Sequence, residues 1–152
     1  MVKKYKKISG SILVIGNEIL SGRTKDQNVS YLASWLNTNL GIKIYEVRIV
    51  QDEEKEIIKN LLNLSKNYNY VFTTGGIGPT HDDITAKSIS RAFKKKYIYN
   101  KEAYEILSKY YGKKEFNDSR KKMAKMPEGS KLIYNPSSAA PGFMIKNIIC
   151  LP

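Results

Sequence analysis

The sequence predicts an α/β fold with three layers, in which helices cover both faces of a doubly wound, mostly parallel sheet. Three observations support this prediction. Short apolar or β-branched runs alternate with stretches of helical periodicity along the first half of the chain. The first of these runs is continuous, as expected of a strand that is buried on both faces. The first and third runs each lead into a polar, glycine-containing loop, which is where ligands bind in folds of this class.

Length and composition favour one domain, residues 1–152. With 41% hydrophobic residues the chain can bury a substantial core, but it is too short for two ordinary domains. Its single cysteine, Cys150, excludes an intramolecular disulfide, as is typical of a reducing cytoplasm, and its place in a terminal strand favours a core role. The apolar run Ile12–Ile15 is too short for a signal peptide or a membrane span. We therefore expect a cytoplasmic protein without a membrane partner.

The formal net charge of +12 is concentrated in two places, the first seven residues and residues 91–125, where twelve basic residues accompany four acidic ones. Such a surface can attract nucleic acid or an anionic substrate. A bias toward A/T-rich codons, which encode Lys, Asn, Ile and Tyr, explains the same lysines without any partner. Because no aromatic-interleaved motif accompanies them, we favour this explanation and do not expect nucleic acid as a partner.

The first strand is predicted at residues 11–16 and ends in a polar loop, residues 16–28, which we call the first loop. Apolar residues then recur at helical spacing from Val29 to Leu40. Asn28 can cap this helix, and Gly41 can end it. The pattern therefore predicts a helix that packs one face on the sheet.

The second strand, residues 42–50, alternates apolar and polar residues, which indicates a more exposed place in the sheet. Asp52 follows and can cap the next helix, which has three glutamates in its first turn. The third strand is expected at residues 70–74, and a further helix at residues 82–93. Strands one and three are neighbours if the strand order is 2-1-3, so their loops meet at the same edge of the sheet.

The second half of the chain is less regular. The expected elements are an extended link at 97–99, helices at 101–111 and 117–126, and strands at 131–134 and 148–152. The two helices carry most of the excess lysine, and Pro127 ends the second. We assign them to an excursion on one side of the sheet.

Three glycines lie within four residues just after the third strand, in a segment that we call the glycine loop, residues 75–83. Gly75, Gly76 and Gly78 allow positive φ and leave the backbone N–H groups open to an anion. A Walker loop is excluded because Pro79 and Thr80 follow the last glycine, and the dinucleotide fingerprint lacks its third glycine. We interpret the loop as a cradle for phosphate or pyrophosphate.

The run from Thr74 to Thr85, Thr-Gly-Gly-Ile-Gly-Pro-Thr-His-Asp-Asp-Ile-Thr, resembles the signature of the molybdopterin-binding, or molybdenum-cofactor-biosynthesis, domain family. Its Pro-Thr-x-Asp-Asp form resembles the branch of the competence- or damage-inducible protein A proteins (CinA-like) and of the N-terminal domain of eukaryotic FAD synthases. Other segments match in order: Gly16–Gly22 with Asp26–Asn28, Val50–Asp52, and Asn135–Phe143. Asn17 takes the family's form without an acid.

The resemblance implies a Rossmann-like fold and one of two chemistries. Some relatives bind molybdopterin and adenylylate it from MgATP, whereas this branch is associated with metal-dependent cleavage of ADP-ribose or FAD. We therefore expect an enzyme acting on a nucleotide pyrophosphate with Mg²⁺ or another divalent cation. The alternatives are a domain that binds or adenylylates molybdopterin and, less favoured, a nucleic-acid binder. The expected partner is a small phosphorylated pterin or nucleotide, and a homo-oligomer is compatible with this function.

The site residues follow from the motifs and the resemblance together. Asp83 and Asp52 are the expected catalytic residues, and Asp52, Asp82 and Asp83 are the candidate metal ligands. Capping alone also explains Asp52, and Asp82 is well placed as an N-cap. The candidate substrate-binding residues are Gly16, Asn17, Glu18, Ser21, Gly22, Asp26, Asn28, Thr74, Gly75, Gly76, Gly78, Pro79, Thr80, Pro141 and Gly142.

Two further expectations concern the end of the chain. The segment Asn135–Phe143 is either a rigid loop that approaches the ligand or an ordinary hairpin connection. In the family, Leu-Pro leads into a second anion-binding loop, Gly-x-Pro, whereas this sequence stops at Pro152. We therefore expect it to be truncated at its C-terminus.

Overall fold

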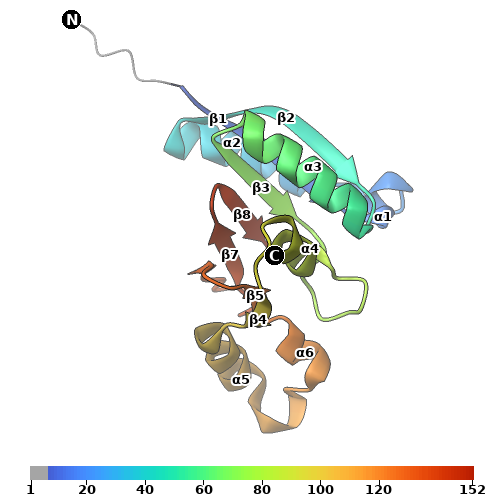
Figure 1. Ribbon diagram of the computed structural model, residues 1–152, viewed down its shortest axis with the longest axis vertical. Coiled ribbons are helices and arrows are strands. Elements are labelled where there is room, and N and C mark those ends of the chain that lie inside the picture. The colour runs from blue at the N-terminus through green and yellow to red at the C-terminus, as the bar shows by residue number, and fades with distance from the viewer. Residues whose placement is uncertain (1–6) are drawn as a thin grey trace, which may run out of the picture.

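A computed structural model describes residues 7–152 (Figure 1). The lysine-rich start of the chain, residues 1–6, lies outside the described residues. The elements are β1 (Ile8–Ile15), α1 (Asn17–Leu20), α2 (Asn28–Leu40), β2 (Ile42–Val50), α3 (Glu54–Asn67), β3 (Tyr70–Thr74), α4 (Thr85–Ala92), β4 (Tyr97–Tyr99), α5 (Lys101–Glu115), α6 (Asp118–Lys122), β5 (Lys125–Pro127), β6 (Lys131–Ile133), β7 (Gly142–Ile145) and β8 (Ile148–Leu151).

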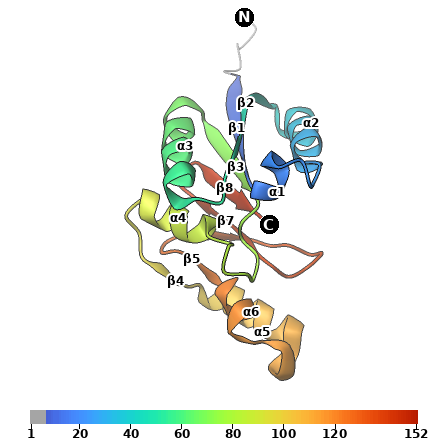
Figure 2. The ribbon, with the colours of Figure 1, turned by 90° about the vertical axis from the view of Figure 1, so that its right-hand side faces the viewer.

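The main sheet has six strands in the order β2-β1-β3-β8-β7-β6. Its first four strands are parallel, and β7 and β6 are antiparallel to their neighbours. The predicted α/β class, the mostly parallel sheet and the 2-1-3 order are therefore confirmed. Figure 2 shows α2 on one face of the sheet and α3 and α4 on the other.

The alternation of side chains in β1 explains why its sequence is apolar throughout. Leu13 and Ile15 pack in the core beneath α3 and α4, whereas Ile12 and Val14 pack with Leu36 of α2. All five side chains are at most 3% exposed. Burying each of them contributes about 1.5 to 3 kcal/mol, so β1 is held firmly at the centre of the sheet. The loop that follows it therefore starts from a fixed point.

Three predicted helix starts differ from the structure. Asp82 is not the N-cap of α4, since that helix begins at Thr85 after Ile84. Asp52 does not cap α3 either, because Glu53 is the capping residue and Asp52 turns toward the first loop. The first turn of α2 is held by the carboxylate of Asp26, which accepts a hydrogen bond from the Val29 amide at 2.8 Å, and not by Asn28.

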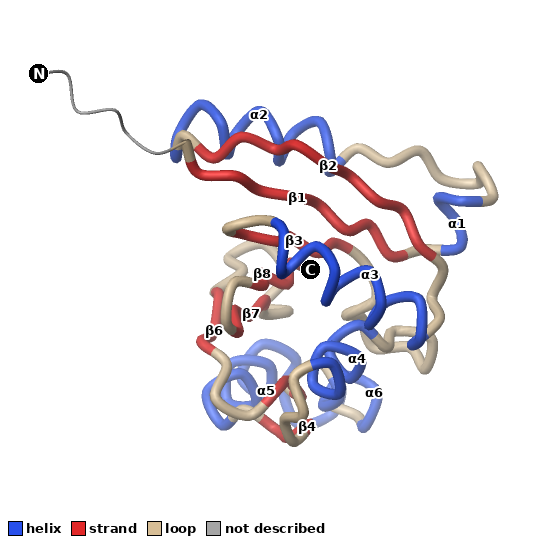
Figure 3. Tube along the Cα trace, turned by 45° about the horizontal axis from the view of Figure 1, so that its top comes forward, coloured by secondary structure: helices blue, strands red, loops and turns tan. Residues whose placement is uncertain are grey.

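The predicted helix at 117–126 is wrong in its second half. Helix α6 stops at Lys122, and the chain then forms β5, which pairs antiparallel with β4 in a small second sheet. Met123, Ala124 and Met126 are buried in the main core, so apolar contact with the rest of the fold overrides local helical periodicity here. Figure 3 shows α5, α6 and β4 grouped together, away from β1 and β2.

The remaining expectations on this region hold. Gly112 interrupts α5 with φ of 69°, and β6 leads through the segment Asn135–Pro141 into β7. Cys150 is fully buried, and burial raises the pKa of its thiol to about 12, so it is a core residue as predicted. Among the helices of residues 7–152, none is both long enough and apolar enough to span a bilayer.

Candidate functional site

The carboxyl ends of β1, β2 and β3 meet at one edge of the sheet, and a cavity of about 350 Å³ opens there. The first loop, the end of β2 and the glycine loop all contribute to it. We call it the site cavity, and its lining residues are Ile15, Asn17, Glu18, Arg23, Asp52, Gly76, Thr80, Asp82 and Asp83. Three segments that lie far apart in the sequence are thus brought together, as the 2-1-3 order predicted.

The glycine loop needs its first two glycines for internal packing. Gly75 and Gly76 have φ of 90° and 67°, which disfavours any side chain. A Cβ at Gly75 would lie 2.1 Å from the carbonyl oxygen of Ile15, and one at Gly76 would lie 2.2 Å from Thr85 Oγ1. Thr85 donates from its hydroxyl to the Gly75 carbonyl and from its amide to the Gly76 carbonyl, both at 2.9 Å.

These contacts turn two carbonyl groups of the glycine loop inward. Within residues 7–152, the amides of Gly76, Ile77 and Gly78 donate no hydrogen bond. Of these three residues, Gly76 borders the site cavity, whereas Ile77 and Gly78 border a smaller pocket behind the loop. The anion cradle stays a prediction, and Gly76 is the one of its three glycines that borders the site cavity.

Asp83 is fixed by the loop that carries it. Its Oδ2 accepts hydrogen bonds from the amide of Thr80 at 2.8 Å and from the hydroxyl of Thr80 at 2.7 Å. Its own amide donates back to the Thr80 carbonyl at 3.3 Å. Asp83 Oδ1 has no hydrogen-bond partner in the part of the chain that the structure describes, so one oxygen positions the carboxylate and the other stays available.

The neighbouring residues are far more exposed. Asp82 lines the site cavity, but its side chain is 76% exposed, and its Oδ1 lies 3.1 Å from Nε2 of His81. His81 is 93% exposed, so it does not pack within the loop.

Asp52 connects the end of β2 to the first loop. Its Oδ2 accepts a hydrogen bond from the Asn17 amide at 2.8 Å, and its amide donates to Asn17 Oδ1 at 3.3 Å. This reciprocal pair holds the start of α1 against β2. The carboxylate of Glu18 folds back over Gly16, where a Cβ would lie 2.7 Å from Glu18 Oε1. The backbone at Gly16 thus leaves room for Glu18 and not for a ligand.

Other predicted ligand residues of the first loop do not line the cavity. Ser21 donates to the Glu18 carbonyl at 3.2 Å and accepts from Nε of Arg23 at 3.3 Å, which makes it a support for Arg23. Asp26 is occupied at the start of α2, as described above. The predicted residues that lie outside the lining of the site cavity are Gly16, Ser21, Gly22, Asp26, Asn28, Thr74, Gly75, Gly78, Pro79, Pro141 and Gly142.

Thr74 and Gly142 are buried instead. Thr74 is 5% exposed, and its hydroxyl has no hydrogen-bond partner among the described residues. Gly142 lies in β7, where a Cβ would lie 2.5 Å from the carbonyl oxygen of Cys150. Close packing of β7 against β8 therefore explains this glycine without any ligand.

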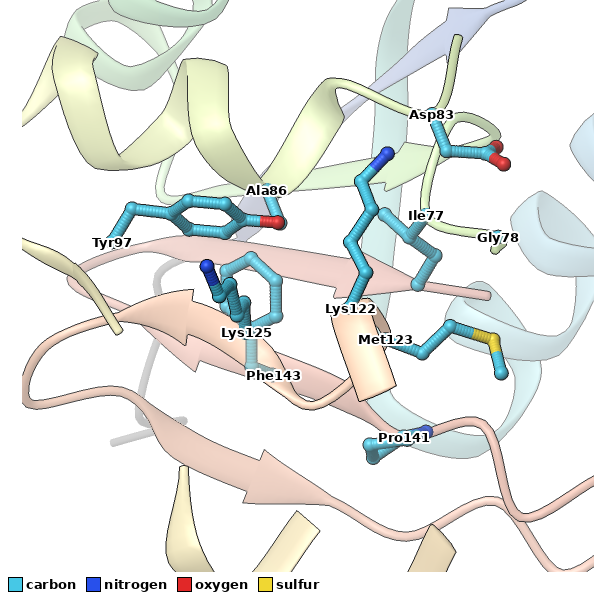
Figure 4. Close-up of a pocket in the computed structure, with 10 residues that line it drawn as sticks. All are labelled: Ile77, Gly78, Asp83, Ala86, Tyr97, Lys122, Met123, Lys125, Pro141 and Phe143. Atoms are coloured by element: carbon cyan, nitrogen blue, oxygen red, sulfur yellow. The ribbon is translucent and has the colours of Figure 1, made fainter. Parts of the chain in front are cut away.

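A second, much smaller pocket of about 10 Å³ lies behind the glycine loop (Figure 4). We call it the rear pocket. Its lining residues are Ile77, Gly78, Asp83, Ala86, Tyr97, Lys122, Met123, Lys125, Pro141 and Phe143. Pro141, which the sequence assigned to the ligand, thus lies against the back of the loop. A pocket of this volume is too small for a substrate. We therefore interpret the residues around it as packing that supports the glycine loop.

Two residues near the site were not predicted. Arg23 lines the site cavity, and Lys122 of α6 donates from Nζ to the carbonyl of Thr80. The sequence contained one usable signal for Arg23, since it is a basic residue in a loop assigned to an anionic ligand. No such signal exists for Lys122, which is one lysine of many in a segment that we interpreted as a solvated surface.

The three acidic residues do not form a closed metal site. Among the described residues, no group of three His, Cys, Asp or Glu side chains lies close enough to hold a metal ion. Asp52, Asp82 and Asp83 nevertheless border the same cavity.

Comparison with known sequences gives consistent results. The family described as "Probable molybdopterin binding domain" matches residues 11–152. A protein of Archaeoglobus fulgidus is 39% identical over 141 residues, which cover 93% of this chain and 60% of that protein. A CinA-like protein of Fusobacterium nucleatum is 37% identical over 146 residues, which cover 95% of this chain and 36% of that protein. The chain thus spans only part of the length of these curated relatives.

Solved structures agree with the sequences. The crystal structure of CinA, a protein with unknown function from Thermoplasma acidophilum, is 30% identical with a TM-score of 0.88, over 97% of this chain and 89% of that one. The tungsten cofactor synthesizing protein MoaB of Pyrococcus furiosus, at 19% identity and a TM-score of 0.59 over 97% and 82%, shares the fold. The chain therefore belongs to the family of probable molybdopterin-binding domains, in the branch of the CinA-like proteins.

Proposed function

We propose that the chain is a divalent-cation-dependent enzyme that cleaves the pyrophosphate link of a nucleotide such as ADP-ribose or FAD. The observation that carries this proposal is the composition of the site cavity. The backbone of Gly76, the guanidinium of Arg23 and the carboxylates of Asp52, Asp82 and Asp83 border one hollow. A pyrophosphate needs hydrogen-bond donors for its oxygens, and the cation that accompanies it needs hard oxygen ligands.

The donors would hold the phosphate oxygens. The open amides of the glycine loop offer closely spaced N–H groups, which suit an anion that sits directly against the backbone. Arg23 adds a charged fork that matches two phosphate oxygens at once. Its side chain is steadied by Ser21 and is otherwise exposed, so it can follow the ligand as it enters.

The carboxylates would hold Mg²⁺ or another divalent cation. Asp83 and Asp52 are half-buried and fixed by hydrogen bonds, whereas Asp82 is exposed. With no set of three ligating side chains in residues 7–152, the ion would share oxygens with the pyrophosphate and retain several waters. When bound, the ion neutralises phosphate charge and makes the phosphorus more electrophilic.

In the proposed reaction a water oxygen bonds to one phosphorus, and the bond from that phosphorus to the bridging oxygen breaks. The bridging oxygen leaves with the other phosphate, giving AMP and ribose 5-phosphate from ADP-ribose, or AMP and FMN from FAD. Asp83 would accept a proton from the attacking water at Oδ1, the oxygen that Thr80 does not occupy, so in this step the cation would be held by Asp52 and Asp82. Asp52 keeps the first loop closed over the ligand through Asn17.

A second function, binding or adenylylation of molybdopterin, is favoured by the description of the matching family. An open amide cradle serves a pterin phosphate as well as a pyrophosphate, so the donors alone do not separate the two functions. The carboxylates do not separate them either, because adenylyl transfer from MgATP also needs a divalent cation and oxygen ligands for it. The products of turnover are what distinguish the two functions.

The test is a substrate panel on the full chain. ADP-ribose, FAD, and ATP with molybdopterin are each incubated with and without Mg²⁺, and nucleotide products are separated by chromatography. Release of AMP from ADP-ribose or FAD that requires the cation supports the proposal. Transfer of AMP to molybdopterin, or calorimetric binding of a ligand without any turnover, would reject it in favour of the second function.

A further inference from the structure

Lys122 reaches the glycine loop from a different part of the fold. It is the last residue of α6, and in Figure 4 its side chain extends beside Ile77 toward the segment that carries Asp83. Its Nζ donates to the carbonyl of Thr80, across 42 positions in the sequence. The side chain is half-buried, so this contact lies at the interface between α6 and the loop.

The base of this side chain is firmly anchored. The next two residues, Met123 and Ala124, are at most 9% exposed and belong to the main core. The amide of Asn100 donates to the Ala124 carbonyl at 2.8 Å, which ties the end of α6 to the start of α5. A lysine on such a fixed base delivers its ammonium group to one place with little loss of side-chain entropy.

Thr80 is the point where two sets of contacts converge. Its amide and hydroxyl donate to Asp83 Oδ2, while its carbonyl accepts from the Asp83 amide and from Lys122. We propose that Lys122 is a positioning residue, which locks Thr80 from behind so that Thr80 holds the Asp83 carboxylate in its working orientation. The segment α5–α6 thereby becomes a support of the site.

The electrostatic setting agrees with this role. Burial lowers the pKa of Lys122, whereas the carboxylates of Asp83 and Asp82 act in the opposite direction. A cation behind two acidic residues offsets their mutual repulsion at the edge of the site cavity. The rear pocket, at about 10 Å³, excludes a ligand, so Lys122 acts through the loop and not by direct contact with substrate.

The test compares Lys122→Met, which keeps the length and removes the charge, with Lys122→Arg and with Lys121→Met. Lys121 is the matched control, because it lies in the same helix and its Nζ pairs with Asp118 at 3.3 Å instead of with the loop. The first readout is amide hydrogen exchange in peptides covering residues 75–84 of the free protein, relative to a core peptide of α3. We expect at least tenfold faster exchange in Lys122→Met and no change in Lys121→Met.

The second readout is kcat and KM for AMP release, and this part rests on the proposed function. We expect kcat to fall at least tenfold in Lys122→Met with KM within threefold, and Lys122→Arg to recover most of the loss. Equal exchange in Lys122→Met and wild type would overturn the inference. If the wild type releases no AMP, the proposed function fails while the exchange data still decide on Lys122. Faster exchange that extends equally to the α3 peptide would show general unfolding and would also overturn it.

Discussion

The two loops that form the site are held in different ways. The glycine loop is fixed by its own hydrogen bonds. Thr85 donates to the carbonyls of the first two glycines, and Thr80 donates to the carboxylate of Asp83. The first loop is tied at its two ends, by hydrogen bonds of Gly16 and Asn17 to the end of β2 and by Asp26 at the start of α2, and from Ser21 to Lys25 it is exposed. A rigid loop keeps phosphate donors and a carboxylate in fixed geometry, whereas an exposed one adapts to the rest of a substrate. Under the proposed function, this difference assigns chemistry to the glycine loop and recognition to the first loop.

The largest expected effect comes from Gly76→Ala, which breaks the rigid loop. The new Cβ would meet Thr85 Oγ1 at 2.2 Å and would sit on a backbone with φ of 67°. Left-handed strain and overpacking together cost about 3 kcal/mol or more. We expect the midpoint of thermal unfolding to fall by roughly 6 to 12 °C, measured by circular dichroism, and AMP release to be lost.

Gly22→Ala in the first loop is the control for Gly76→Ala. Gly22 has φ of 75°, but a Cβ there would have no neighbour within 4 Å. Only the backbone cost of about 1 kcal/mol applies, so the unfolding midpoint falls by just a few degrees. Equal losses in the two variants would show that the glycine loop is not packed as tightly as its geometry indicates.

The next effect is on chemistry alone. Asp83→Asn keeps an oxygen that can accept from Thr80, so the loop and the unfolding midpoint should change little. The amide accepts no proton and carries no charge for a cation, and we expect kcat for AMP release to fall by about 100-fold or more. Asp82→Asn, at a side chain that is 76% exposed, should cost far less than this. A larger loss in Asp82→Asn than in Asp83→Asn would reverse the assignment of the two residues.

Most of the architecture around the site could be predicted from the sequence, for local reasons. The apolar run of β1 predicts a buried strand, the glycines follow β3 and the aspartate follows β2. Parallel strands in the order 2-1-3 then bring their ends together. The prediction did not require side-chain detail. It failed for Asp82 as the cap of α4, since Asp83 turns back to Thr80 and delays the helix to Thr85.

The support of the site could not be predicted in the same way. Lys122 lies at the end of a helix in a lysine-rich segment, and only the packing of Met123 and Ala124 in the core brings it to Thr80. Long-range placement of this kind leaves no periodic pattern in the sequence. Gly142 shows the opposite error. The sequence analysis assigned it to the ligand as part of a motif, but a glycine is needed there because a Cβ would collide with the carbonyl oxygen of Cys150.

Loosening the first loop should have a moderate effect. Asn17→Ala removes the acceptor of the Asp52 amide, although the hydrogen bond from its own amide to Asp52 can persist. We expect about 1 kcal/mol of lost stability by urea unfolding, the typical value for one hydrogen bond. Because the loop would close less firmly over a ligand, KM should rise by about threefold to tenfold while kcat changes less. A loss confined to kcat would contradict the role in recognition.

The smallest effect on stability is expected for Arg23→Met, which tests recognition without touching the fold. Arg23 is exposed, and in the described chain its side chain forms a hydrogen bond only with Ser21, so the unfolding midpoint should not move beyond experimental error. One charge-assisted contact to phosphate accounts for roughly 1.5 kcal/mol, which corresponds to about a tenfold rise in KM. Arg23→Lys should recover part of this, since an ammonium contacts phosphate as a point charge but lacks the planar fork.

The neighbouring Lys25→Met serves as the control for lost charge, because Lys25 does not line the site cavity. If both variants raise KM equally, long-range attraction by the basic surface and not direct contact explains the effect, and the first loop loses its assigned part in recognition.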